Sequence, residues 1–259
     1  MKKGILFIGH GSRLKHNKEA IEAQAEALKE RIGLPVWTAY NETTEPLVDS
    51  AVEKMVDSGI EEIIAIPFFI ASGLHTTKDI PRRLGIPEGS SGGDTVVAGK
   101  TVTVHLEQPF GEDPNLTDIL EERVVEICGK AEPSVIVIGH GSRLGYNKEV
   151  VKINAERLSE RGYANVYYGF NEFNSPSIEE AMSDAVKSGA DDIAVLPLFI
   201  ASGAHLAEEI PEKLGIPMNS GGGVSSLYGR DVNIHYAMPV GNDPRLIEVL
   251  VKKLEKYGI

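Results

Sequence analysis

The first half of the chain alternates short apolar runs with stretches in which apolar residues recur at helical spacing. The run Ile5–Ile8 ends at Gly9 and predicts a buried parallel strand, and Ile21, Ala25 and Leu28 then mark one face of a helix. The same alternation predicts four strands, at Ile5–Ile8, Pro35–Tyr40, Ile63–Phe69 and Val102–His105. It predicts helices that begin near Lys18, Pro46, Thr77 and Pro114. The order βαβαβαβα indicates a parallel sheet with helices on both faces.

The second half repeats this pattern without insertions. Gly9–Leu14 returns unchanged as Gly139–Leu144, 130 residues further on. The matching strands are expected at Val135–Ile138, Asn165–Gly169, Ile193–Phe199 and Val232–His235. We therefore predict an α/β fold with two doubly wound units of four parallel strands each, covering residues 1–130 and 131–259. The short join near Gly129–Pro133 indicates that the units pack directly, related by a pseudo-two-fold axis as in a fused dimer.

Two segments rich in glycine and serine interrupt the pattern in corresponding places. They are Gly85–Lys100 and Gly215–Arg230, and each precedes the last strand of its half. We expect both to be flexible loops that could act as lids.

Polar side chains collect where the predicted strands end. In an open parallel sheet, ligands bind outside the carboxyl ends of the strands. His10, Asn41 and Glu42, and the segment Phe69–Gly73 followed by His75, all lie at this rim. Imidazole and carboxylate together suit divalent Co, Ni, Fe or Zn. The candidate catalytic residues are His10, Glu42, His75, His140, Glu172 and His205, and the four histidines are the candidate metal ligands.

Simpler roles remain open for these residues. A lone histidine in a loop is more often a hydrogen-bonding group than a ligand, and Glu42 could cap the helix that begins at Pro46. His105 and His235 end strands and are expected to support the structure rather than to bind. Whether one or both of the His–Glu–His sets work is not decided by the sequence.

The loop Gly9–Ser12 lies between a strand and a helix, where free backbone N–H groups favour an anion. A tight turn capped by Ser12 is the alternative. No Walker A or dinucleotide fingerprint is present, so ATP and NAD are not implied. The candidate substrate-binding residues are Gly11, Ser12, Arg13, Ser72, Gly73, Gly141, Ser142, Arg143, Ser202 and Gly203.

Composition narrows the class of protein. The 259 residues carry a formal net charge of −12, which argues against a nucleic-acid partner. The single Cys128 excludes an internal disulfide, and we expect it to be a small apolar residue in a helix. The first apolar run is too short for a signal peptide, and no run has the length of a membrane span. We expect a cytoplasmic protein that binds no membrane.

Three segments together carry a resemblance. Ile8–Arg13, Asn41-Glu42 and Pro67–His75 are similar to the class II, ATP-independent sirohydrochlorin chelatases, and the resemblance covers nearly the whole chain in two copies. The length resembles the family's long forms, in which two units are fused and the metal-binding residues are often kept in one half. This chain keeps them in both, which leaves open which half works.

The resemblance implies an enzyme that inserts a divalent metal into sirohydrochlorin, with His10 and His75 as metal ligands and Glu42 as the associated carboxylate. His140, His205 and Glu172 match the same motif. Co²⁺ is favoured, with Ni²⁺ or Fe²⁺ as alternatives, and no permanently bound cofactor is expected. The expected partners are sirohydrochlorin and the metal ion, with the ring lying between the two halves of a monomeric pseudo-dimer.

Other functions stay open on the sequence. A non-enzymatic tetrapyrrole or metal carrier would use the same residues. A two-lobed small-molecule binding protein is disfavoured by the short join. A hydrolase that uses the Gly-His-Gly-Ser loop would need more arginine around the site than is present.

Overall fold

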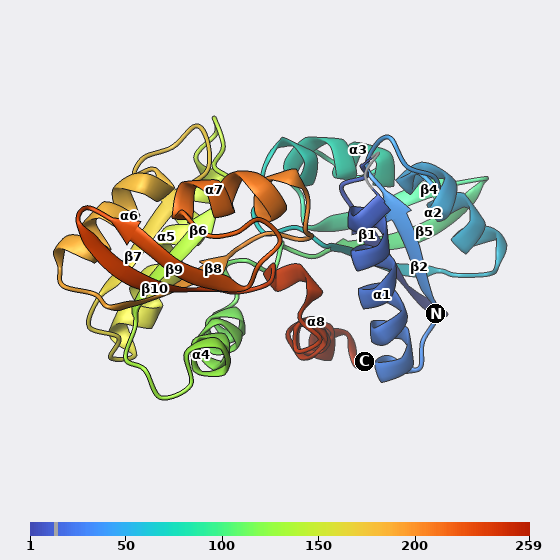
Figure 1. The fold of residues 1–259 in the computed structure, drawn as a ribbon. Coiled ribbons are helices and arrows are strands. Elements are labelled where there is room, and N and C mark those ends of the chain that lie inside the picture. Colours follow the sequence, from blue (N-terminus) through green and yellow to red (C-terminus); the bar gives the residue numbers. More distant parts are fainter. Residues whose placement is uncertain (13–14) are drawn as a thin grey trace. The chain divides into compact units, whose positions relative to one another are not determined.

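The computed structural model describes residues 1–12 and 15–259, and the side chains of 1–12 and 17–259. The chain forms two compact units. The first contains Met1–Phe110 and Pro244–Ile259, and the second contains Gly111–Asp243. Each unit holds one five-stranded sheet with helices packed against it (Figure 1).

The first unit has the strand order β2-β1-β3-β5-β4. Its strands are β1 Lys3–Gly9, β2 Val36–Tyr40, β3 Glu62–Pro67, β4 Gly92–Val97 and β5 Lys100–Leu106. Its helices are α1 Lys15–Ile32, α2 Val48–Asp57, η1 His75–Asp79, α3 Ile80–Leu84, α8 Leu246–Leu254 and η4 Glu255–Tyr257. The pairs β1–β2, β1–β3 and β3–β5 are parallel, and β4 runs antiparallel to β5.

The second unit repeats this arrangement in the order β7-β6-β8-β10-β9. Its strands are β6 Ser134–Gly139, β7 Val166–Phe170, β8 Asp192–Pro197, β9 Gly222–Leu227 and β10 Arg230–Tyr236. Its helices are α4 Pro114–Cys128, α5 Tyr146–Glu160, α6 Ile178–Lys187, η2 His205–Glu209, α7 Ile210–Leu214 and η3 Val240–Asn242. The expected α/β class and the two copies are confirmed.

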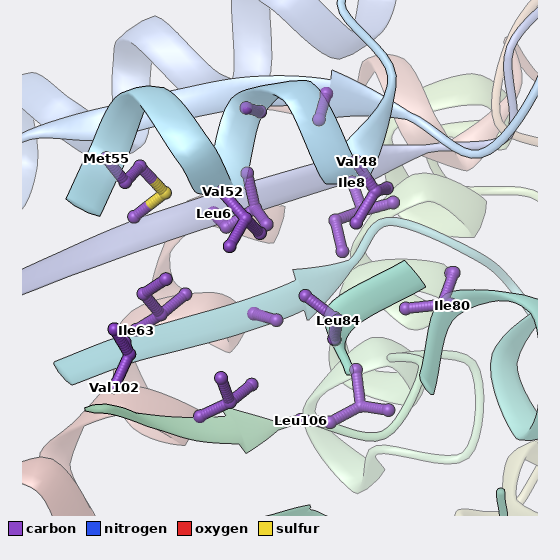
Figure 2. Close-up of a cluster of buried hydrophobic side chains, with 14 of the residues drawn as sticks. Leu6, Ile8, Val48, Val52, Met55, Ile63, Ile80, Leu84, Val102 and Leu106 are labelled. Atoms are coloured by element: carbon purple, nitrogen blue, oxygen red, sulfur yellow. The ribbon is translucent and has the colours of Figure 1, made fainter. Parts of the chain in front are cut away.

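The core of the first unit explains why β1 is apolar throughout. Leu6 and Ile8 project toward α2, where Val48 and Val52 meet them (Figure 2). Successive residues of a strand point to opposite faces, so Phe7 projects the other way and packs on Phe68 with ring centroids 5.0 Å apart. Both faces of the sheet are therefore covered, as the continuous apolar run predicts.

The strand count differs from the prediction of four parallel strands per unit. The Gly/Ser-rich segments are not flexible loops, because each forms the outer strand of a β-hairpin. β4 and β5 are joined by Ala98 and Gly99, with φ of 50° and 78°, and Tyr228 and Gly229 repeat this turn at 52° and 79°. Two residues at positive φ connect twisted antiparallel strands well.

β4 is not predicted by apolar runs, because its sequence is rich in glycine and polar residues. An edge strand leaves much of its surface in water, so it does not need the hydrophobic runs that mark buried strands. Its first glycine instead allows the backbone of β4 to pass close to the backbone of β5. A Cβ on Gly92, at φ +152°, would lie 2.4 Å from the carbonyl oxygen of Val104.

The compact units do not coincide with the sequence repeats. The helix that ends the first repeat, α4, belongs to the second unit, and the helix that ends the second repeat, α8, belongs to the first. In the first unit α8 packs on α1, where Arg31 Nε donates to Glu248 Oε1 at 2.9 Å. The division at residue 130 describes the repeats, and it stays a prediction as a domain boundary.

A buried ion pair fastens α4 within the second unit. Arg123 Nε donates to Asp243 Oδ2 at 2.7 Å, and the two side chains are only 9% and 2% exposed. On the same helix, Cys128 is partly buried, and burial raises the pKa of its thiol to about 11. No helix in the described part of the chain has the length and apolar character needed to cross a bilayer.

This ion pair generates a stability prediction. We expect Arg123→Met to lower the free energy of unfolding by about 3–5 kcal/mol, because it removes the guanidinium from a carboxylate that water cannot reach. Arg161→Met is the matched control. Arg161 pairs with the more exposed Asp118 and Glu121 of α4, so its loss should cost about 1 kcal/mol or less. Urea unfolding of both variants measures the difference, and equal losses would contradict the assignment.

Candidate functional site

The loops that follow β1 and β2 are joined by their backbones. The Glu42 amide donates to the His10 carbonyl at 3.1 Å, and the Asn41 amide donates to the Gly9 carbonyl at 2.9 Å. Gly11 has φ +91°, and a Cβ there would lie 1.7 Å from the Glu42 carbonyl oxygen. Only glycine fits this contact, which holds His10 and Glu42 side by side.

His75 reaches the same place from a third loop. It is the first residue of η1, a π-helical turn, where the prediction had a helix beginning near Thr77. The turn is anchored by Thr76, whose hydroxyl accepts from the Gly73 amide at 2.9 Å. The His75 ring meets the His10 ring edge-on, with centroids 4.6 Å apart and an interplanar angle of 80°.

These three residues form the first candidate metal site. His10, Glu42 and His75 each offer a ligand atom, and those atoms lie within 4.8 Å of one another. His10 Nδ1 and Glu42 Oε1 are 3.5 Å apart, and the two side chains are 43% and 45% exposed. The structure thus brings the predicted first set together at an open rim, where an ion can arrive and leave.

The second repeat builds the same group. His140, Glu172 and His205 meet the same distance limit, and the two imidazoles are again edge-on, at 4.9 Å and 82°. Gly141, at φ +90°, repeats the backbone contact, since a Cβ would lie 1.8 Å from the Glu172 carbonyl oxygen. Both predicted sets are therefore assembled, and their role as ligands stays a prediction.

Sequence reasoning missed two carboxylates that contact the histidines. His75 Nδ1 lies 2.9 Å from Asp79 Oδ2, and His205 Nδ1 lies 2.6 Å from Glu209 Oε2. The hydrogen bond with His205 lowers the pKa of the Glu209 carboxyl below its ordinary value, and Asn171 acts in the same direction. The signal was present in the sequence, because each carboxylate stands four residues after its histidine in the same short turn.

The expected anion cradle is partly occupied by the protein's own side chains. The Ser12 amide donates to Thr44 Oγ1 at 3.1 Å, the Ser142 amide to Asn174 Oδ1 at 2.7 Å, and the Gly141 amide to Asn147 Oδ1 at 2.9 Å. A ligand anion would have to compete for these donors.

The remaining substrate-binding candidates have varied surroundings. Arg13 lies outside the described residues. Arg143 stands over the Phe173 ring at 5.2 Å, and Ser72 Oγ donates to Gln108 Oε1 at 3.5 Å. The Gly73 amide is used by Thr76, and Ser202 and Gly203 are half-buried. Substrate binding by any of them stays a prediction.

His105 and His235 are not part of the candidate metal-binding groups found among the described residues. His105 Nε2 is 3.3 Å from Glu62 Oε1, and His235 Nε2 is 2.8 Å from Asp192 Oδ1. The bond with His235 lowers the pKa of the Asp192 carboxyl. Each histidine thus ties the last strand of its sheet to the start of its neighbour, as a supporting residue would.

The two rims carry different charge. Within residues 75–84 of the first unit Lys78, Arg82 and Arg83 outnumber Asp79, a net +2, whereas within residues 205–214 of the second Glu208, Glu209 and Glu212 outnumber Lys213, a net −2. A cavity of about 590 Å³ lies beside the first set. Its lining residues are Asn41, Glu42, Asp49, Asp79, Arg82 and Arg83. Arg83 Nη1 donates there to Asp49 Oδ1 at 2.9 Å.

A repeated α/β sheet with candidate histidine and carboxylate ligands at its rim is the arrangement expected of a metal-handling protein. Residues 4–127 and 134–257 each match the CbiX family. The chain belongs to the CbiX family, which confirms the chelatase resemblance and, with it, the expected enzyme class of metal chelatase.

Curated relatives match one repeat's length of this chain. The sirohydrochlorin cobaltochelatase of Methanosarcina barkeri is 39% identical over 126 residues, which cover 48% of this chain and 96% of that protein. The enzyme of the same name from Saccharolobus solfataricus is 39% identical over 122 residues, covering 47% and 93%.

Solved structures agree on the fold. SirB from Bacillus subtilis with Fe³⁺ superposes with a TM-score of 0.79 at 22% identity, covering 99% of this chain and 95% of that one. The structure of CbiX described as the terminal enzyme for siroheme biosynthesis in denitrifying bacteria gives 0.68 at 24% identity, covering 98% of both chains.

The contact between Gly11 and Glu42 generates a prediction. We expect Gly11→Ala to displace the loop of Glu42 and to weaken Co²⁺ binding by the first set, beyond the cost of about 1–2 kcal/mol for an alanine at positive φ. Gly33→Ala controls for that cost, because Gly33 has φ +68° and open space around its Cβ position. Calorimetric Co²⁺ titration and urea unfolding of both variants separate the two effects. Equal behaviour would show that the backbone contact does not hold the site.

Proposed function

We propose that the protein inserts a divalent metal ion into sirohydrochlorin without ATP, and that Co²⁺ is its metal, with Ni²⁺ and Fe²⁺ as the alternatives. The observation that carries the proposal is the assembly of His10, Glu42 and His75, repeated as His140, Glu172 and His205. Family membership and the names of the curated relatives support the substrate and favour cobalt.

The ligand set suits an ion that must be handed over. Two imidazoles and one carboxylate bind borderline divalent ions without enclosing them. The side chains of His10 and Glu42 are almost half exposed, so the ion keeps coordination positions that ring nitrogens can take. An ion held by three ligands in an open rim exchanges more readily than one inside a closed four-ligand site.

Insertion also releases two protons from the pyrrole nitrogens of the ring. Glu42 is placed to receive a proton, because its carboxylate stands beside the imidazoles and opens to solvent. A carboxylate or an imidazole within reach of the reacting N–H can act as the general base near neutral pH. Glu172 occupies the corresponding position in the second set.

The macrocycle carries several carboxylates, so charge around the rim matters. Arg82 and Arg83 lie on the first cavity beside Glu42, Asp49 and Asp79, whereas Glu212 and Lys213 stand at the matching positions of the second unit, so the first rim repels such a polyanion less than the second does. The ion pair of Arg83 with Asp49 is at the surface, where such pairs contribute little, so a ligand carboxylate can replace Asp49. We infer that the first set performs most of the insertion.

A tetrapyrrole or metal carrier would use the same ligands without turnover. The two functions differ in stoichiometry. A carrier stops at one equivalent of metallated ring per site, whereas a chelatase continues until a substrate is exhausted.

The two sets can be separated by paired substitutions. We expect His10→Ala with His75→Ala to lower the insertion rate by about 100-fold or more, since it removes both ligands and a general base. His140→Ala with His205→Ala should retain most of the rate. Anaerobic incubation with sirohydrochlorin and Co²⁺, Ni²⁺ or Fe²⁺ in turn, followed by the absorbance shift of the ring, measures both. Product that stops at one equivalent per site would favour the carrier. Full insertion activity in the His10→Ala/His75→Ala variant would contradict the main role of the first set.

A charge exchange tests the preference for the first rim. Arg82→Glu with Arg83→Lys gives the first rim the residues of the second, and we expect KM for sirohydrochlorin to rise several-fold with kcat little changed. The increase should shrink at high salt, because the interaction is screened. Glu212→Arg with Lys213→Arg is the reciprocal variant. An unchanged KM at low salt would show that these arginines do not attract the ring.

A further inference from the structure

We propose that Asp79 and Glu209 are positioning residues, which hold His75 and His205 in the tautomer that presents the Nε2 lone pair to the metal ion. The inference rests on the proposed function, because it takes the two histidines as ligands. It adds two carboxylates to the six candidate catalytic residues.

The geometry is the same in both units. Asp79 ends η1 and Glu209 ends η2, each four residues after the histidine that begins the turn. The amide of the following residue, Ile80 or Ile210, bonds back to that histidine's carbonyl, as in a π-helical turn. Four residues are almost one turn of such a helix, so the carboxylate comes beside the ring. It meets Nδ1 at 2.9 Å in the first unit and 2.6 Å in the second.

The contact decides which ring nitrogen binds the ion. A neutral imidazole carries one N–H, and a carboxylate can only accept. A bond between the two therefore keeps the proton on Nδ1 and leaves the Nε2 lone pair free. The negative charge also makes Nε2 a more basic ligand, as carboxylate partners of metal-binding histidines do.

A second neighbour favours the opposite tautomer. Asn41 Nδ2 lies 2.9 Å from His75 Nδ1, and an amide N–H there can only donate. Its bond requires a lone pair on Nδ1, which moves the proton to Nε2 and removes the ligand. Asp79 and Asn41 thus compete for one nitrogen, and the carboxylate makes the stronger, charge-assisted bond.

In the second unit the corresponding contact is longer, since Asn171 Nδ2 lies 3.3 Å from His205 Nδ1. Lys213 Nζ donates to Asn171 Oδ1 at 2.9 Å, which fixes the orientation of the amide. The same Nδ2 lies 3.4 Å from Glu209 Oε2, so the amide also reaches the carboxylate. In the first unit the corresponding Arg83 donates to Asp49 and not to the asparagine. The buried Asn41 Oδ1 has no hydrogen-bond partner among the described residues. The first set therefore depends more heavily on Asp79.

The two units also supply a natural substitution. Aspartate in one and glutamate in the other reach the same nitrogen from the same position. The function of the position is thus the carboxylate and not a particular side-chain length, and Asp79→Glu should preserve it.

The experiment measures Co²⁺ binding without tetrapyrrole. In a His140→Ala/His205→Ala background only the first set remains. We expect Asp79→Asn to weaken Co²⁺ binding by about 10–100-fold and to change the visible d–d spectrum of the bound ion. Asp79→Glu should restore both affinity and spectrum. Asp49→Asn removes the same charge from the same cavity without touching His75, and it should leave both unchanged.

Each other outcome overturns the inference. Parent-like affinity and spectrum in Asp79→Asn would show that Asp79 does not position His75. If Asp49→Asn weakened Co²⁺ binding equally, the effect of Asp79→Asn would come from the loss of negative charge in the cavity and not from the contact with His75. A folded Asp79→Glu that binds as poorly as Asp79→Asn would assign the position a packing role. The proposed function fails differently, through a parent that binds Co²⁺ but does not metallate sirohydrochlorin. A parent in which the first set binds no Co²⁺ overturns both.

Discussion

The backbone contact between the loops after β1 and β2 is the constraint on which the site depends. Gly11 at φ +91° lies so close to the Glu42 carbonyl that no side chain fits between them. His10 precedes this contact and Glu42 belongs to it, so one glycine sets the separation of two candidate ligands. Parallel strands make the contact available, because β1 and β2 are neighbours whose carboxyl ends open at one edge. His75 is fixed independently, by the first residue of a π-helical turn.

The features that follow from burial and from chain direction could be predicted from the sequence. Ile5–Ile8 could be assigned to a strand because both faces of β1 are covered, and the rim followed from where such strands end. β4 could not be found in this way, since an edge strand is identified by its partner and its turn rather than by apolar residues. Asp79 was missed for a related reason. The contact of Asp79 with His75 depends on a π turn, which brings the fourth residue after the histidine next to its ring. The spacing of apolar residues does not indicate such a turn.

The two repeats show what the fold fixes and what it leaves to side chains. Both units have the glycine contact at Gly11 or Gly141, the edge-on imidazoles and a carboxylate in contact with Nδ1. The residues around them have diverged. Lys213 of the second unit donates to Asn171, whereas the corresponding Arg83 of the first donates to Asp49. Glu212 stands where the first unit has Arg82. The backbone therefore repeats one arrangement of candidate ligands, while the charged side chains and hydrogen bonds around the two arrangements differ.

A chelatase must hold an ion firmly enough to orient it and loosely enough to release it. In this protein the two demands fall on different atoms. The candidate ligand atoms lie on side chains that are almost half exposed, which favours exchange. The groups that orient them are less free to move, because they are backbone contacts at Gly11 and hydrogen bonds within a short helical turn. Preorganisation of this kind lowers the cost of assembling the site without adding a fourth ligand that would trap the ion. An open set of three candidate ligands, oriented by backbone contacts and by hydrogen bonds within a helical turn, thus suits both demands of metal transfer.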